Sequence, residues 1–121
     1  MKEDKLVIVN ARIYGTFLGI TDQGHMTFFV FLEWSFSSQG LGGYVIDKYL
    51  KDSKEREGWK LAIPAIRKIL ETVGVEKWED LKGKLVRIKV AELGSSRPPV
   101  IGNILEDKWF DLKEFVEAHK D

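Results

Sequence analysis

Aromatic and basic side chains that alternate with apolar residues give this sequence its clearest chemical pattern. Phe29 and Phe31 alternate in one predicted strand, and Arg87 and Lys89 alternate in another. Alternate residues of a strand share a face, so both pairs are expected on an outer face of a sheet. Rings on which bases stack, beside cations that contact phosphates, are typical of proteins that bind single-stranded nucleic acid. The alternative is that a C-terminal helix covers the two phenylalanines as a second small core, which leaves the cations on an ordinary solvated face.

The segment 34–44 is the second candidate, because it carries no charge in a protein that is 31% charged and contains three of the eleven glycines. Glycine lets other groups approach the backbone closely. We therefore expect Gln39, Gly42, Gly43 and Tyr44 to contact a ligand. The spacing is not that of a phosphate-binding loop, and the segment leads into an apolar strand where a dinucleotide-binding motif requires a helix. The alternative is a bulged crossover between two strands.

Catalytic and metal-binding groups are scarce in this sequence. The absence of cysteine excludes disulfides, thiolate metal sites and a cysteine nucleophile. The two histidines, His25 and His119, have no neighbours at a spacing typical of zinc or nucleophile sites. Asp47 is the acid best placed for chemistry, although capping the next turn is the more common role of such a residue. We therefore predict a protein without enzymatic activity, metal or cofactor.

The composition indicates a single folded domain over residues 1–121. Hydrophobic residues make up 44% of the chain and aromatic residues 12%, which is enough for a core. Lysine plus arginine and aspartate plus glutamate number 19 each, so the formal net charge is zero, which argues against electrostatic binding of duplex nucleic acid. The chain shows no apolar core of a signal peptide and no apolar run of membrane-spanning length, which predicts a cytoplasmic protein without membrane contact. Many lysines and glutamates suggest a thermophilic source.

Five strands and two helices are expected to position the candidate residues. The first helix has Pro64 in its first turn, apolar residues at helical spacing and Gly74 at its end. A charged connection over residues 47–58 precedes it, and a short helix near the C-terminus turns Leu112 and Phe115 inward. The predicted strands are residues 5–20, 25–34, 44–46, 84–93 and 100–105.

The order of three strands, a helix and two strands predicts a mainly β protein of the α+β type. It is the order of the OB-fold, a five-stranded, partly open barrel, here with a helix between strands three and four and a short C-terminal helix. The first strand of such a barrel is long and bent, and Gly15 and Gly19 lie where that bend is expected. The alternative is an open sheet with a helix packed on one face.

Several segments together resemble a group of small phage- and prophage-encoded proteins. The most specific is the SxQGxGGY-type pattern of residues 37–44, and residues 10–24, 74–84 and 101–110 add to it. The likeness covers most of the chain. It implies a viral source rather than a particular reaction, because small phage proteins commonly bind single-stranded DNA or disable a host factor. Neither role needs catalytic residues.

The sequence therefore predicts a non-enzymatic binding protein that recognises single-stranded nucleic acid or a nucleotide. The contacts are expected from Phe29, Phe31, Tyr44, Arg87 and Lys89, with the glycine-rich segment beside them. The alternative is a viral interaction protein that binds and inhibits a host defence protein, with that uncharged segment as its docking surface. Salt separates the two functions, because contacts with phosphates weaken as salt rises, whereas docking through an uncharged surface does not.

Overall fold

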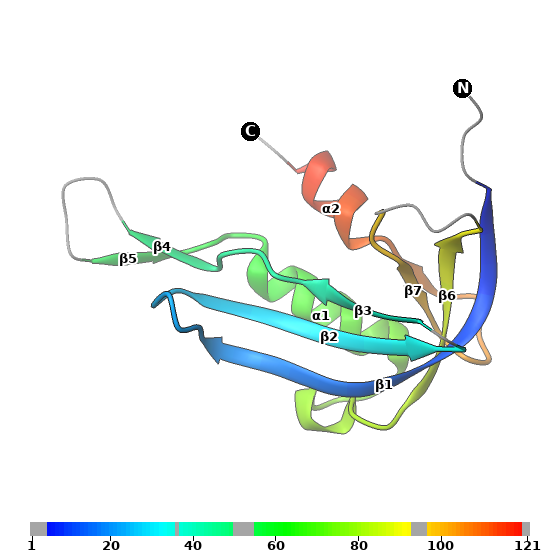
Figure 1. Cartoon of the computed structure of the whole chain (residues 1–121). Helices are drawn as coiled ribbons and strands as arrows, with labels where there is room; N and C mark the ends of the chain where they lie inside the picture. The colour runs from blue at the N-terminus through cyan, green and yellow to red at the C-terminus, as the bar shows by residue number, and fades with distance from the viewer. Residues whose placement is uncertain (1–4, 36, 50–54, 93–96, 120–121) are drawn as a thin grey trace.

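The protein consists of a large antiparallel sheet, a separate short hairpin and two helices (Figure 1). The computed structural model describes residues 5–35, 37–49, 55–92 and 97–119, so positions 36, 50–54 and 93–96 of the predicted segments lie outside the described residues. The strands are β1 (Leu6–Ile20), β2 (Met26–Trp34), β3 (Ser37–Gly42), β4 (Asp47–Tyr49), β5 (Arg56–Gly58), β6 (Leu85–Ala91), β7 (Val100–Gly102) and β8 (Trp109–Phe110), and the helices are α1 (Ala62–Val73) and α2 (Leu112–Ala118).

Strand β1 pairs with a different neighbour along each of its halves. Residues 6–12 pair with β6, and residues 12–20 pair with β2. The register between β1 and β2 shifts between Ile13 and Gly15, which is typical of a β-bulge. The prediction of an irregularity at Gly15 is confirmed, whereas Gly19 lies in regular pairing. Figure 1 shows β1 curving away from β2 toward β6.

The six strands of the sheet follow the order β3-β2-β1-β6-β7-β8. The prediction of a mainly β protein is confirmed, but the sheet does not close into a barrel within the described residues, so the expected partly open, OB-like barrel is not confirmed. Within the described residues, β3 at one end of the sheet does not pair with a strand at the other end. Strand β8 gives the physical reason, because it occupies the edge of β7 at which a barrel of this order closes. The structure is instead an open sheet with a helix on one face, which was the alternative.

The core lies between the sheet and α1, which runs along one face of it (Figure 1). Ile69 of α1 is fully buried in a cluster that includes Phe28 and Ile88 of the sheet. Helix α2 adds Leu112 and Val116 to the same cluster, so both helices pack on the core side of the sheet. Neither described helix has the length and apolar composition needed to cross a membrane.

Local signals set the two ends of α1. Pro64 lies in the first turn, where its missing N–H leaves no hydrogen bond unmade. Gly74 ends the helix with a φ of 92°, and its N–H donates to the carbonyl oxygen of Leu70 at 2.8 Å. Both predictions are confirmed.

The predicted third strand lies in the wrong place. Residues 37–42 form β3, which is the glycine-rich segment itself, whereas residues 44–46 lie in no strand. The glycines hide β3 from sequence reasoning, because a residue without a side chain has no polarity that can alternate. The charged connection over residues 47–58 contains the β4–β5 hairpin, which extends away from the sheet (Figure 1). The last predicted strand ends at Gly102, and β8 follows it.

Candidate functional site

Four aromatic side chains lie on the face of β1 and β2 that points away from the core. They are Tyr14, Phe17, Phe29 and Phe31, and we call this set the aromatic strip. The rings of Phe29 and Phe31 are stacked, with centroids 5.3 Å and planes 14° apart, and Tyr14 continues the row 5.9 Å from Phe31. Phe17 lies opposite Phe29 in the strand register, and both Phe17 and Tyr14 are exposed. The two phenylalanines predicted from the sequence thus belong to a longer surface of rings.

Helix α2 does not cover the aromatic strip. Its Phe115 packs against Phe110, with ring centroids 5.4 Å apart, and lies against the core together with Leu112. None of the four rings of the strip belongs to the core cluster or packs against it. The alternative in which the C-terminal helix covers Phe29 and Phe31 is therefore wrong, and the strip is open within the part of the chain that the structure describes.

Glycines beside the strip make room for its rings. A Cβ atom at Gly40 would lie 3.1 Å from the ring of Phe29, and one at Gly43 would lie 3.0 Å from the same ring. Gly42 is more restricted, because its φ of 122° directs a Cβ atom into the carbonyl oxygen of Phe28. The space that these glycines leave is thus filled by protein atoms. The rings of Phe29 and Phe31, rather than the glycines themselves, therefore form the outer surface of the glycine-rich segment.

Arg87 and Lys89 surround Trp109 on the outer face of the sheet. The Arg87 guanidinium is 4.8 Å and the Lys89 ammonium is 4.4 Å from the centroid of the Trp109 ring, which is within cation–π range. The indole lies against Gly102, its partner in the strand register, where a Cβ atom would collide with it. An aromatic ring over a cross-strand glycine therefore occurs here as well as in the strip.

The structure separates this cation–aromatic cluster from the strip. Arg87 lies opposite Asn10 of β1, whereas Phe31 lies opposite Gly15, about 16 Å further along that strand. Arg87 also donates from Nε to the carbonyl oxygen of Asn103 at 2.8 Å, so its charge is partly engaged. The single constellation of two phenylalanines and two cations that the sequence suggests is therefore two clusters on one face.

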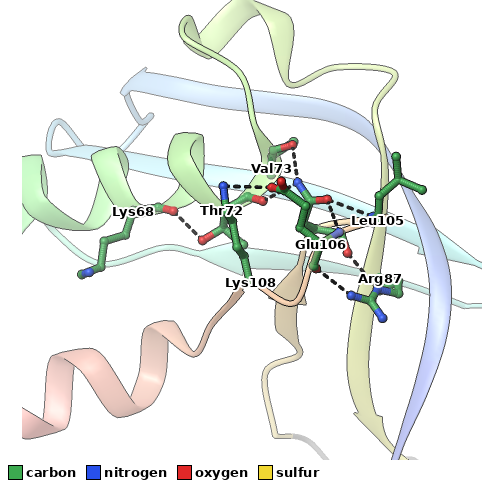
Figure 2. Close-up of polar contacts among 8 residues, drawn as sticks. Lys68, Thr72, Val73, Arg87, Leu105, Glu106 and Lys108 are labelled. Carbon is green, nitrogen blue, oxygen red and sulfur yellow. Dashed lines mark hydrogen bonds and ion pairs between the residues drawn. The ribbon is translucent and has the colours of Figure 1, made fainter.

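Asn103 was not predicted as an important residue, yet it uses its whole hydrogen-bonding capacity. Its Nδ2 donates to the carbonyl oxygens of Thr72 at 3.0 Å and Val73 at 3.2 Å, at the end of α1. Its Oδ1 accepts from the N–H groups of Leu105 at 2.9 Å and Glu106 at 2.8 Å. Figure 2 shows Thr72 and Val73 meeting the segment of Leu105 and Glu106 across this network. The role of Asn103 is structural, since it ties a helix end to a turn.

Tyr44 lies apart from the strip, in a groove of about 550 Å³ near the ends of both helices. Its ring stacks on Trp59, with centroids 5.5 Å apart and planes 28° apart. Burial raises the pKa of the Tyr44 hydroxyl, and the negative charges of Glu117 and Asp111 raise it further. The Tyr44 hydroxyl is therefore protonated at neutral pH, so it is not a phenolate nucleophile.

Gln39 and Asp47 do not lie with the aromatic strip in one common site. Gln39 lies opposite the core residue Leu32, so it is on the core side of β3. Asp47 accepts a hydrogen bond from the N–H of Met26 and forms an ion pair with Arg56 at 3.3 Å. It ties β4 to β2 and β5. Among the described residues, no group of three or more histidines, aspartates or glutamates is placed to hold a metal ion.

Sequence reasoning missed two of the four rings of the strip. Tyr14 and Phe17 are an odd number of positions apart, so regular alternation puts them on opposite faces of a strand. The bulge beside Gly15 changes the alternation and brings both to the outer face. The one signal in the sequence was Gly15 itself, because glycine within a strand often marks a bulge.

Comparisons with models of protein families, with curated proteins and with solved structures gave no match. The resemblance to small phage-encoded proteins therefore stays a prediction. The outer face of the sheet is the feature from which a function can be inferred.

Proposed function

We propose that this is a small non-enzymatic binding protein that holds single-stranded nucleic acid, or a nucleotide, on the aromatic strip. The observation that carries the proposal is the row of Tyr14, Phe31 and Phe29 on a sheet face that no described helix covers. Bases of any identity stack on such rings, and each stacked base contributes about 1–3 kcal/mol. An OB-like binding mode, with the strand lying across the curved face of the sheet, belongs to the same proposal.

Positive charge makes a smaller contribution in this proposal. Arg87 and Lys89 lie on the same face and are the cations that we expect to contact phosphates. With two such contacts, the logarithm of the affinity falls against the logarithm of the salt concentration with a slope of about −1.4, at about −0.7 for each contact. The chain has no net charge, so stacking dominates the binding and its dependence on salt is shallow.

Fluorescence anisotropy with a fluorescein-labelled thymine oligonucleotide at low salt tests this function. Phe31→Ala removes the central ring and is expected to weaken the affinity by about 5- to 150-fold, which corresponds to one stacked base. Phe115→Ala is the matched control, since the same truncation on the core side lowers stability without changing the affinity of the folded protein. Wild-type protein that binds no oligonucleotide at low salt would contradict the proposal.

A second candidate function is the inhibition of a host defence protein by a viral protein. The observation that favours it is exposed aliphatic surface on the same face, where Ile8 is 55% and Leu85 is 58% exposed. Aliphatic side chains bury well against a protein partner but offer bases no ring on which to stack. In this case the affinity for the partner does not depend on salt, and oligonucleotides do not bind.

A further inference from the structure

A groove with both polar and apolar lining residues lies on the outer sheet face at one end of the aromatic strip. Its volume is about 680 Å³, and its walls come from β1, β3, β6 and the end of β2. Glu33 follows Phe31 by two residues on the same face of β2, about 7 Å along the strand. The groove therefore begins where the row of rings ends. Its lining includes Asn10, Arg12, Glu33, Ser37, Ser38 and Leu85.

Arg12 and Glu33 form an ion pair that lines this groove. They face each other in the strand register, and Arg12 Nε donates to Glu33 Oε1 at 3.0 Å. The side chains are 55% and 44% exposed, so a ligand can reach both. Within the described part of the chain, the two Nη groups of Arg12 and Oε2 of Glu33 have no protein partner. Two donor groups and an acceptor thus remain for a ligand.

The backbone at the rim of the groove is unusual. Ser35 has a φ of 39°, a left-handed conformation that is uncommon for serine. No other described residue except glycine has a positive φ. Conformations of this kind are concentrated at ligand-binding sites, where the surrounding structure holds them in place.

The donors and acceptor of this pair match one base better than the others. The Watson–Crick edge of cytosine presents the N4–H donor group beside the N3 and O2 acceptors. The two Nη groups of Arg12 can donate to N3 and O2, and Oε2 of Glu33 can accept from N4–H. Guanine offers two neighbouring donors and one acceptor on this edge, thymine offers one donor between two acceptors, and adenine offers one donor group beside one acceptor. Each of these bases therefore makes fewer of the possible hydrogen bonds.

We infer that the groove reads one base of the bound strand and prefers cytosine. The inference rests on the proposed binding of single-stranded nucleic acid by the strip. One base stacks on Phe31, and the neighbouring base places its edge against Arg12 and Glu33. A bidentate contact of this type discriminates between bases by about 5- to 150-fold in affinity.

The test compares three fluorescein-labelled nine-residue DNA strands. Each is a run of thymines whose central base is thymine, cytosine or 2-pyrimidinone, which lacks the N4 amino group of cytosine. The full-length protein is expected to bind the cytosine strand about 5- to 150-fold more tightly than the thymine strand, with the 2-pyrimidinone strand in between. Glu33→Gln replaces one acceptor oxygen by a donor group, so the preference should fall below about twofold.

Two further variants test whether a loss of base preference comes from the groove. Glu71→Gln is the matched control, because Glu71 forms an exposed pair with Arg67 on α1, with 3.6 Å between the charged groups, and it should keep the full preference. Arg12→Lys keeps the charge but loses the planar donor fork, so it should also lose the preference. Thermal melting shows whether each variant is folded. If Glu33→Gln does not fold, Arg12→Lys tests the base preference in its place.

The outcomes distinguish the groove from the strip. Equal affinities of the wild-type protein for the three strands, still weakened by Phe31→Ala, overturn the base-reading groove and leave the proposed function standing. A cytosine preference that survives both Glu33→Gln and Arg12→Lys also overturns it. Absence of binding to all three strands at low salt overturns the proposed function, and the groove inference with it.

Discussion

Single glycine residues determine where the backbone and rings beside the aromatic strip can lie. Gly42 has a left-handed φ of 122°, and the carbonyl oxygen of Phe28 occupies the direction in which a Cβ atom would project. Gly83 has a left-handed φ of 91°, but no atom lies within 4 Å of a Cβ atom built there. Comparing the two positions therefore separates the cost of the backbone conformation from the cost of a steric conflict.

Gly83→Ala is expected to lower the free energy of unfolding by about 1–2 kcal/mol, the cost of a left-handed conformation for a residue with a Cβ atom. Gly42→Ala should lower it by about 1–3 kcal/mol more, because β2 and β3 must move apart to relieve the conflict with Phe28. Urea denaturation followed by circular dichroism measures both losses. Equal losses would show that the sheet relieves the conflict without cost.

Tyr44 gives the protein a dependence on alkaline pH. Burial raises the pKa of its hydroxyl above the ordinary value of 10.0, so the folded protein holds this proton more tightly than the unfolded chain. The resulting stability is complete below about pH 10 and is lost as the pH rises through the raised pKa. The unfolding free energy of Tyr44→Phe should therefore fall less steeply above about pH 10 than that of the wild type. Urea denaturation at a series of pH values measures the difference, and Tyr49→Phe, at a 60% exposed position, is the control. Parallel curves for wild type and Tyr44→Phe would refute the expectation.

At the scale of elements, Asn103 holds the end of α1 against the turn that precedes β8. Asn103→Asp keeps the size of the side chain but removes the two N–H donors, so the carbonyl oxygens of Thr72 and Val73 lose their partner. The expected loss of unfolding free energy is about 2 kcal/mol or more, because buried polar groups are left unsatisfied. Chemical denaturation measures it. Asn10→Asp at an exposed position is the control, with an expected change within about 0.5 kcal/mol. A similar effect of the two substitutions would mean that the network contributes nothing.

Elements with one buried and one exposed face could be predicted from the sequence, because their apolar and polar side chains follow a regular pattern. Alternation located β1, β2 and β6, and helical spacing located α1, since a core lies on one side of each. Strand β3 was not predicted because its glycines have no side chains, and β8 was not predicted because two residues are too few to show a pattern. The open edge of the sheet was not predictable, because pairing between distant strands leaves no local signal.

In the candidate site, too, features set by a local pattern could be predicted, and features set by the pairing of distant strands could not. The outward face of Phe29 and Phe31 follows from alternation in one strand, and it was predicted. Their distance from Arg87 depends on the register of three strands and on the bulge in β1, and neither is visible in a local pattern. Residue types and faces were therefore accessible from the sequence, whereas distances between them were not.

At the scale of the whole molecule, the sheet separates the core side from the face on which we propose that the ligand binds. Leu112 of α2 is almost fully buried on the core side, so Leu112→Ala is expected to lower the unfolding free energy by about 2–5 kcal/mol. The affinity for a thymine oligonucleotide should stay unchanged wherever the variant is folded, because the strip lies on the opposite face. Denaturation and anisotropy measured on the same sample test both statements. A weakened affinity of the folded variant would mean that the two sides are coupled.

The double pairing of β1 also sets the order in which the molecule can assemble. Its second half meets β2 after a short turn, with Ile20 opposite Met26, whereas its first half must wait for β6, with Leu6 opposite Ala91. Contacts between residues close in sequence form sooner than distant ones, because closing a longer loop costs more entropy. The meander of β1, β2 and β3 is therefore expected to form first, and pulse-labelled hydrogen exchange should protect the amides of residues 16–20 before those of residues 6–10. During synthesis, the rings of the strip would then be in place on the ribosome before the strand that completes the sheet has been made.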